Sequence, residues 1–228
     1  MATANKKPQT RKLPATAMTV PFGTITIPET AKRLIAEALA STLVSCGRMV
    51  GEFEAKFAAL HGVNEAVAVA TGTHAVILAL AVLHDFGAKR GDEVIVPALS
   101  FVATGNAVLH AGFKPVFVDV ERETLNIDAS KIGRAITRKT RAIVPVHLMG
   151  KPAAMDEILR IAKRRKLLVV EDAAEAHGAL YKKRPAGSMG DLGAFSTFVA
   201  HIITTIEGGV ITTDRADYAE ILRSLRSH

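Results

Sequence analysis

The feature that most restricts the fold is an alternation, between residues 66 and 170, of short β-branched runs with stretches of helical periodicity. Glu93–Val96 is typical of the runs, and Met155–Lys166 is typical of the helical stretches. Strands that alternate with helices form βαβ units, in which helices cover both faces of a mostly parallel sheet. We therefore predict an α/β fold. The predicted strands are 66–70, 93–96, 115–118, 142–146, 167–170, 195–198 and 210–213, and the helices among them are 73–86, 103–111, 129–136 and 155–166.

The last two predicted strands, 195–198 and 210–213, lie too close together for a helical crossover. The final strand should therefore pair antiparallel to its predecessor. About seven strands then form one sheet, of which one strand is antiparallel and the others are parallel.

The N-terminal part of the chain has a different character. Residues 1–20 are polar, basic and aperiodic, so we expect a disordered leader there. Residues 21–228 should contain an N-terminal segment and the main domain. That segment is predicted to hold two helices, Glu29–Thr42 and Glu52–His61.

Composition excludes several classes of protein. The longest apolar run, Ala75–Leu83, is too short to cross a membrane, so we expect a cytoplasmic protein without a membrane partner. Cys46 is the single cysteine, which rules out an internal disulfide and an iron–sulfur cluster held by this chain. The net charge of +7 permits nucleic-acid binding, but the chain has no Trp and few aromatic residues. A basic surface that attracts a diphosphate-bearing small molecule fits at least as well.

Two loops at the carboxyl edge of the predicted sheet could contact a ligand. Thr71-Gly72-Thr73 opens a helix, where free N–H groups and the helix dipole favour a phosphate; the alternative is an ordinary capped helix start. Phe101 follows the next strand and could stack on a flat ring, or it could belong to the core. No metal site is predicted.

Glu171 and Asp172 follow directly after a hydrophobic strand. Two adjacent acids there are costly unless one of them meets a cation or a metal. A protonated ring nitrogen of a bound ligand is such a cation, and a carboxylate beside it keeps that nitrogen protonated and makes the ring an electron sink. Asp172 is our candidate for this role, against the alternative of a helix N-cap.

The segment 193–213 combines two short strands with a loop rich in polar residues. Ser196 and His201 belong to this loop, together with Thr204, Thr205 and Glu207. Loops held by a rigid sheet often carry chemistry. The alternative for His201 is a loop histidine that bonds to a backbone carbonyl.

Several of these segments match one family in the same order. They include Gly51-Glu-Phe-Glu54, Thr71-Gly-Thr73, Gly91-Asp-Glu-Val-Ile-Val-Pro97, Phe101-Val-Ala-Thr104, Pro115-Val-Phe-Val-Asp119, Pro145-Val-His-Leu148, Glu171-Asp-Ala-Ala174 and Glu207-Gly-Gly209. From about Gly47 onward the chain resembles the DegT/StrS family of pyridoxal-phosphate sugar aminotransferases. The resemblance implies the large domain of a fold-type-I enzyme. It places Gly72, Thr73 and Ser196 near the cofactor phosphate, Phe101 on the cofactor ring and Asp172 at the ring nitrogen.

Two residues depart from the family pattern. Glu175 stands where the family usually has Gln, and it would approach the ring hydroxyl. His201 stands where the family has the lysine that binds pyridoxal phosphate covalently, and an imidazole has no primary amine for that bond. The sugar 3-dehydratase branch carries the same replacement and uses pyridoxamine phosphate, with the histidine as base.

We therefore expect 3-dehydration of a 4-keto-6-deoxy sugar nucleotide with His201 as base. The alternatives are a sugar aminotransferase and a non-catalytic relative. The resemblance also implies a homodimer and a smaller C-terminal domain beyond residue 228, which this chain lacks. The apolar stripe of Ile221, Leu222 and Leu225 should then be left without a cover.

Overall fold

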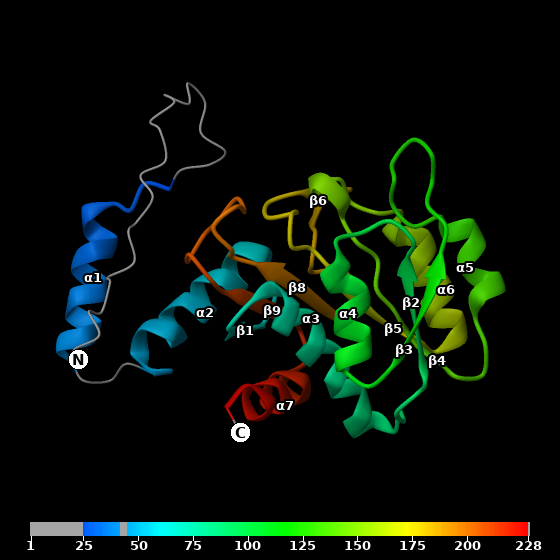
Figure 1. The fold of residues 1–228 in the computed structure, drawn as a ribbon, viewed down its shortest axis with the longest axis horizontal. Helices are drawn as coiled ribbons and strands as arrows, with labels where there is room; N and C mark the ends of the chain where they lie inside the picture. The colour runs from blue at the N-terminus through cyan, green and yellow to red at the C-terminus, as the bar shows by residue number, and fades with distance from the viewer. Residues whose placement is uncertain (1–24, 42–44, 228) are drawn as a thin grey trace, which may run out of the picture.

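Seven strands form one mixed sheet in the computed structural model, which describes residues 25–41 and 45–227 (Figure 1). Their order across the sheet is β1-β9-β8-β5-β4-β2-β3. β9 runs antiparallel to both of its neighbours, and the other pairs are parallel, which confirms the predicted topology. The strands are β1 (Glu65–Val69), β2 (Glu93–Pro97), β3 (Lys114–Val118), β4 (Thr140–Ile143), β5 (Leu168–Asp172), β8 (Leu192–Ser196) and β9 (Gly209–Thr213).

Helices cover both faces of the sheet, as the alternating pattern predicts. Side chains along β2 alternate between the two sides: Val94 and Val96 pack in one buried cluster and Ile95 in another. The first cluster lies under α3 (Gly72–Ala81), α4 (Val102–His110) and α7 (Ala216–Ser227). The second lies under α5 (Ala129–Ala135) and α6 (Met155–Arg165). α2 (Arg48–His61) covers a third cluster, around Phe195.

Several boundaries differ from the prediction. The strand predicted at 195–198 is β8, Leu192–Ser196, and it begins with residues that have no β-branched side chain. Gly193 belongs there because a Cβ at this position would lie 2.1 Å from the Gly187 carbonyl oxygen. The predicted helix 73–86 divides into α3 and the 3-10 helix η1 (Val82–Phe86). The prediction also missed the short 3-10 helix η2 (Leu148–Gly150) and a small hairpin of β6 (Leu180–Tyr181) and β7 (Arg184–Pro185).

The expectation of an uncovered stripe on α7 is wrong for most of its length. Leu222 is fully buried against the sheet, Ile221 packs partly against the same cluster, and Leu225 is 38% exposed. Tyr218 and Ala219 are buried beside Leu222. The sheet itself therefore covers this helix.

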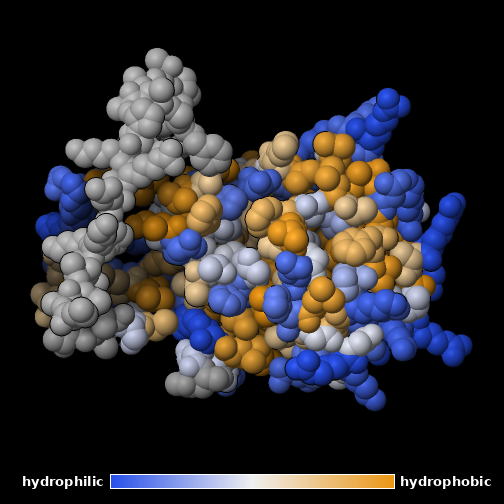
Figure 2. Space-filling view, viewed as in Figure 1, coloured by the Kyte–Doolittle hydropathy of each residue, from blue (hydrophilic) through white to orange (hydrophobic). Residues whose placement is uncertain are grey.

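The N-terminal helix α1 (Glu29–Ala40) lies outside α2, at one end of the molecule (Figure 1). None of its residues is buried, and Leu34, Ile35 and Leu39 are exposed. Apolar residues reach the surface in this region and at other places on the same face (Figure 2). The predicted leader, residues 1–20, lies outside the described residues. Among residues 25–41 and 45–227, no helix has both the length and the apolar composition that a membrane span requires.

Candidate active site

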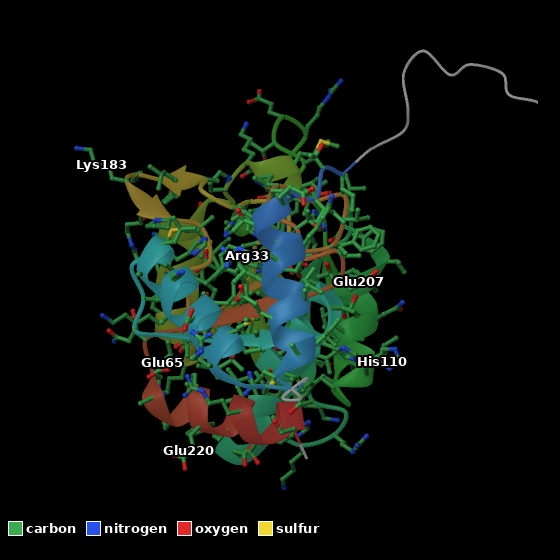
Figure 3. All side chains as sticks on the ribbon, turned by 90° about the vertical axis from the view of Figure 1, so that its left-hand side faces the viewer. Arg33, Glu65, His110, Lys183, Glu207 and Glu220 are labelled. Atoms are coloured by element: carbon green, nitrogen blue, oxygen red, sulfur yellow. The ribbon has the colours of Figure 1, made fainter. Side chains whose placement is uncertain are left out.

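The predicted ligand-binding residues gather at one edge of the sheet. The carboxyl ends of the parallel strands β1, β2, β5 and β8 meet there, and antiparallel β9 begins there. The loop 197–208 between β8 and β9 lies above the sheet in Figure 1, and α7 lies below it. Figure 3 likewise shows Glu207 of this loop well above Glu220 of α7. This edge is where open α/β sheets bind their ligands.

The turn from β1 into α3 makes a close contact with the end of β8. A Cβ on Gly72 would lie 2.5 Å from the Cβ and 2.8 Å from the Oγ of Ser196. Across the same turn, a Cβ on Gly209 would lie 2.3 Å from the Thr71 carbonyl oxygen. Neighbouring atoms lie too close to either position for any side chain, so both positions require glycine. The Ser196 hydroxyl therefore lies against the start of α3.

The start of α3 offers N–H groups to an anion. Thr71 caps the helix, because its Oγ1 accepts a hydrogen bond from the His74 amide at 3.1 Å. The amides of Gly72 and Thr73 precede the first intrahelical hydrogen bond of α3. The capped start that we considered as an alternative is thus present, and it is compatible with a phosphate cradle.

Asp172 ends β5 and is 7% exposed. Its Oδ2 accepts a hydrogen bond from Thr104 Oγ1 at 2.8 Å, and its Oδ1 accepts a longer one from the Ala174 amide at 3.3 Å. Burial raises the pKa of Asp172 above its ordinary value, and the bond from Thr104 opposes that rise. The side chain is therefore poised to receive a cation, which would stabilise its charge.

Glu171 points away from Asp172 and needs no cation. Its two oxygens accept hydrogen bonds from the amides of Gly187, Met189 and Gly190 and from His147 Nε2, at 2.6 to 2.9 Å. The Nδ1 of His147 accepts from the Ala153 amide, so Nε2 carries the hydrogen that it donates. Sequence reasoning missed this role, since three of the donors are backbone groups more than fifteen residues away.

Phe101 and Glu175 are both exposed at this edge. Phe101 is 76% exposed directly before α4, which excludes the alternative that it belongs to the core. Glu175 Oε2 accepts a hydrogen bond from the Met149 amide at 2.8 Å, and its charge raises the pKa of Asp172. Both side chains are accessible to a ligand next to Asp172.

His201 is half-buried on the loop 197–208, and its ring lies 6.3 Å from that of Phe198. Threonine hydroxyls hold the loop: Thr197 Oγ1 and Thr205 Oγ1 lie 2.6 Å apart, and Thr205 also donates to the Glu207 carbonyl. Within the described residues, no direct contact joins His201 to Asp172. The structure therefore places His201 on the predicted loop without bringing it against the carboxylate.

His177 is a buried residue that the sequence did not single out. It is 8% exposed, and its ring packs 5.2 Å from Phe195 and 6.2 Å from Phe57. Neither ring nitrogen has a hydrogen-bond partner. Burial, together with the charges of His61 and His201, lowers its pKa to about 4. The imidazole of His201 is therefore close enough to that of His177 to influence its protonation.

The residues at this edge fit a phosphorylated pyridine. The close approach of Gly72 and Ser196 beside the free amides suits a phosphate, and the buried Asp172 keeps one oxygen with only a long hydrogen bond. In the described part of the chain, no group of three or more His, Cys, Asp or Glu side chains could hold a metal ion. The amides at the start of α3 and the carboxylate of Asp172 together suit an organic anion with a basic ring nitrogen.

Comparisons with known proteins agree with this geometry. Residues 26–228 match the DegT/DnrJ/EryC1/StrS aminotransferase family. The GDP-perosamine synthase of Caulobacter vibrioides is 48% identical over 193 residues, which are 84% of this chain and 51% of that protein. The GDP-4-keto-6-deoxy-D-mannose 3-dehydratase of Escherichia coli O55:H7 is 38% identical over 86% of this chain and 51% of its own length.

Solved structures give the same result. The E. coli GDP-4-keto-6-deoxy-D-mannose-3-dehydratase with bound hydrated PLP superposes with a TM-score of 0.84 and 36% identity, over 91% of this chain and 54% of that one. The chain thus spans about half the length of the curated relatives that it matches.

Proposed function

Because this chain belongs to the DegT/DnrJ/EryC1/StrS aminotransferase family, we propose that it holds the cofactor site of a nucleotide-sugar enzyme that uses pyridoxal or pyridoxamine phosphate. Within this family we propose the sugar 3-dehydratase reaction, in which a 4-keto-6-deoxy sugar nucleotide loses its 3-hydroxyl group. The residue that carries this choice is His201, which we place where the family has its covalent lysine.

Each residue of the edge has a proposed role. Gly72, Thr73 and Ser196 bind the phosphate through amides and a hydroxyl, Phe101 stacks on the ring, and Asp172 pairs with its nitrogen. Glu175 contacts the ring hydroxyl, where two negative charges would repel unless one group is protonated. When bound, the cofactor supplies an electron sink that depends on a protonated ring nitrogen.

His201 acts as the base in this proposal. An imidazole exchanges protons near neutral pH, so its nitrogen can take the proton whose removal allows the 3-hydroxyl to leave. The half-buried position of His201, within the loop that follows Ser196, supports this role because the ring is both held and reachable.

A covalent-trapping experiment tests the position of His201. Borohydride treatment with pyridoxal phosphate should leave no adduct within residues 193–213 of the natural chain, because this segment contains no lysine. His201→Lys should gain one reduced adduct per chain at position 201, mapped by mass spectrometry. The matched control is Glu207→Lys on the same loop. Equal labelling of both variants, or none at position 201, would show that His201 does not face the cofactor.

A sugar aminotransferase is the second candidate, favoured by the 48% identity with a GDP-perosamine synthase. His201 argues against it, because the imidazole cannot carry the cofactor covalently. Mass spectrometry of the product from a 4-keto sugar nucleotide and an amino donor separates the two reactions.

A non-catalytic relative is the third candidate. Such a protein would bind neither cofactor form, and absorbance spectra after addition of each form would show that.

We also propose a homodimer that uses residues 47–57 and the loops beside Phe101. The exposed apolar side chains Phe101 and Val102, at 76% and 65%, support an interface there. Static light scattering at micromolar concentration should report twice the mass of the chain. Val102→Glu should shift the equilibrium towards monomer, while Glu220→Lys, at an exposed position on α7, should not. A monodisperse natural monomer would contradict the proposal.

A further inference from the structure

A chain of two hydroxyl groups leads to the buried carboxylate of Asp172. Thr104 Oγ1 donates to Asp172 Oδ2 at 2.8 Å, and Ser100 Oγ lies 2.7 Å from Thr104 Oγ1. A threonine hydroxyl has one hydrogen, which goes to Asp172, so Ser100 is the donor to Thr104. The direction of both hydrogen bonds therefore matches an ionised Asp172.

The two oxygens of Asp172 differ in what they receive. Oδ2 has a short bond from Thr104, which is 2% exposed, whereas Oδ1 has the 3.3 Å bond from the Ala174 amide. A bond of that length is weak. Oδ1 is consequently the oxygen with acceptor capacity left for a ligand.

We propose that Ser100 and Thr104 are positioning residues, which fix Oδ2 of Asp172 so that Oδ1 is free to accept a hydrogen bond from the cofactor ring nitrogen. This inference rests on the proposed function, since the ring nitrogen is the partner of Oδ1. The hydroxyl chain itself is independent of any ligand. It begins at Ser100 on the turn before α4 and continues to Thr104 in the first turn of that helix, four residues later.

The electrostatic surroundings of Asp172 make the chain of two hydroxyl groups important for its charge. Burial raises the pKa of Asp172, and the nearby charge of Glu175 raises it further. The hydrogen bonds from Thr104 and the Ala174 amide lower it. Thr104 is the strongest of the groups that favour the ionised form, and Ser100 strengthens its donation by polarising the hydroxyl.

The test compares Thr104→Val, which keeps the shape and removes the hydroxyl, with Thr104→Ser, which keeps the hydroxyl. The titration of the Asp172 carboxyl is followed by NMR of the cofactor-free chain with carbon-13-labelled aspartate, assigned with Asp172→Asn. Thr104→Val should raise the midpoint by about one to two pH units, because a hydrogen bond to a charged group is lost. Thr104→Ser should stay within about half a unit of the natural chain. Ser100→Ala, a change at a half-buried site, should give a smaller rise in the same direction.

Pyridoxal phosphate binding, measured by absorbance, is the second readout. Thr104→Val should bind it about tenfold more weakly, and Thr104→Ser should not. An Asp172 midpoint that is the same in Thr104→Val, Ser100→Ala and the natural chain would overturn the inference. If the midpoint shifts in Thr104→Val and Ser100→Ala but the natural protein binds no cofactor, the role of the two hydroxyl groups is supported and the proposed function is overturned instead.

Discussion

Glu171→Ala should lower the free energy of unfolding by about 4 kcal/mol or more, because it removes the acceptor of several buried hydrogen-bond donors at once. Glu171 is fully buried, and four hydrogen-bond donors surround its two oxygens. Alanine would leave three backbone amides and His147 Nε2 without an acceptor, and each buried unsatisfied group costs about 1–3 kcal/mol. Urea unfolding, followed by circular dichroism, measures the difference.

Two further variants keep this prediction testable. Glu171→Gln retains one acceptor oxygen but directs an NH2 group at other donors, so it should be destabilised by a smaller amount and should remain folded. Glu220→Ala, on the exposed side of α7, should change stability by less than about 0.5 kcal/mol. If Glu171→Ala unfolded at the same urea concentration as Glu220→Ala, the hydrogen bonds to Glu171 would not be a major source of stability.

The reason for a large effect is the place of Glu171 in the fold. Its hydrogen bonds fasten the segment before β8 to the end of β5, and through His147 they fasten the loop after β4 as well. Asp172 is the next residue in the chain. The structural carboxylate and the proposed functional one therefore lie on opposite faces of a single strand.

The sequence predicts those parts of the fold in which local signals agree with packing. β2 and β9 are β-branched, and the turn at Gly72 has the glycine and cap residues of a helix start. The start of β8 was not predicted because Leu192, Gly193 and Ala194 are not β-branched. Gly193 is required there by space, since a Cβ would meet Gly187 and Thr212. Propensity does not detect a requirement that comes from a neighbouring segment.

The candidate site divides in the same way. Asp172 and Ser196 could be predicted because they follow strands, and strand ends define the ligand edge. Thr104 could not, because its partner Asp172 is 68 residues away. His147 likewise finds Glu171 across 24 residues. The adjacent acids indicated that their charges need a partner. They did not indicate that backbone amides and an imidazole are the partners of Glu171.

Acidification from pH 7.5 to 4.5 should remove about 2–3 kcal/mol of stability through His177 alone. The ordinary pKa of a histidine is 6.5, and burial lowers that of folded His177 to about 4. The unfolded chain therefore takes up the proton first, so the loss begins near pH 6.5 and is complete near pH 4. Neither ring nitrogen has a partner to share an added charge, and the ring packs against Phe57 and Phe195.

Other groups titrate over the same range, so a variant must isolate the effect. Burial lowers the pKa of His61 as well, which adds to the acid loss, whereas burial raises those of Asp172 and Asp191, which opposes it. His177→Leu fills the apolar site without a titratable group, and urea unfolding at both pH values should show a loss smaller by about 2–3 kcal/mol than in the natural chain. His110→Gln, at an exposed position on α4, should keep the natural dependence. An unchanged pH dependence in His177→Leu would mean that His177 is charged in the folded protein, and that the aromatic cluster around Phe195 accommodates the charge.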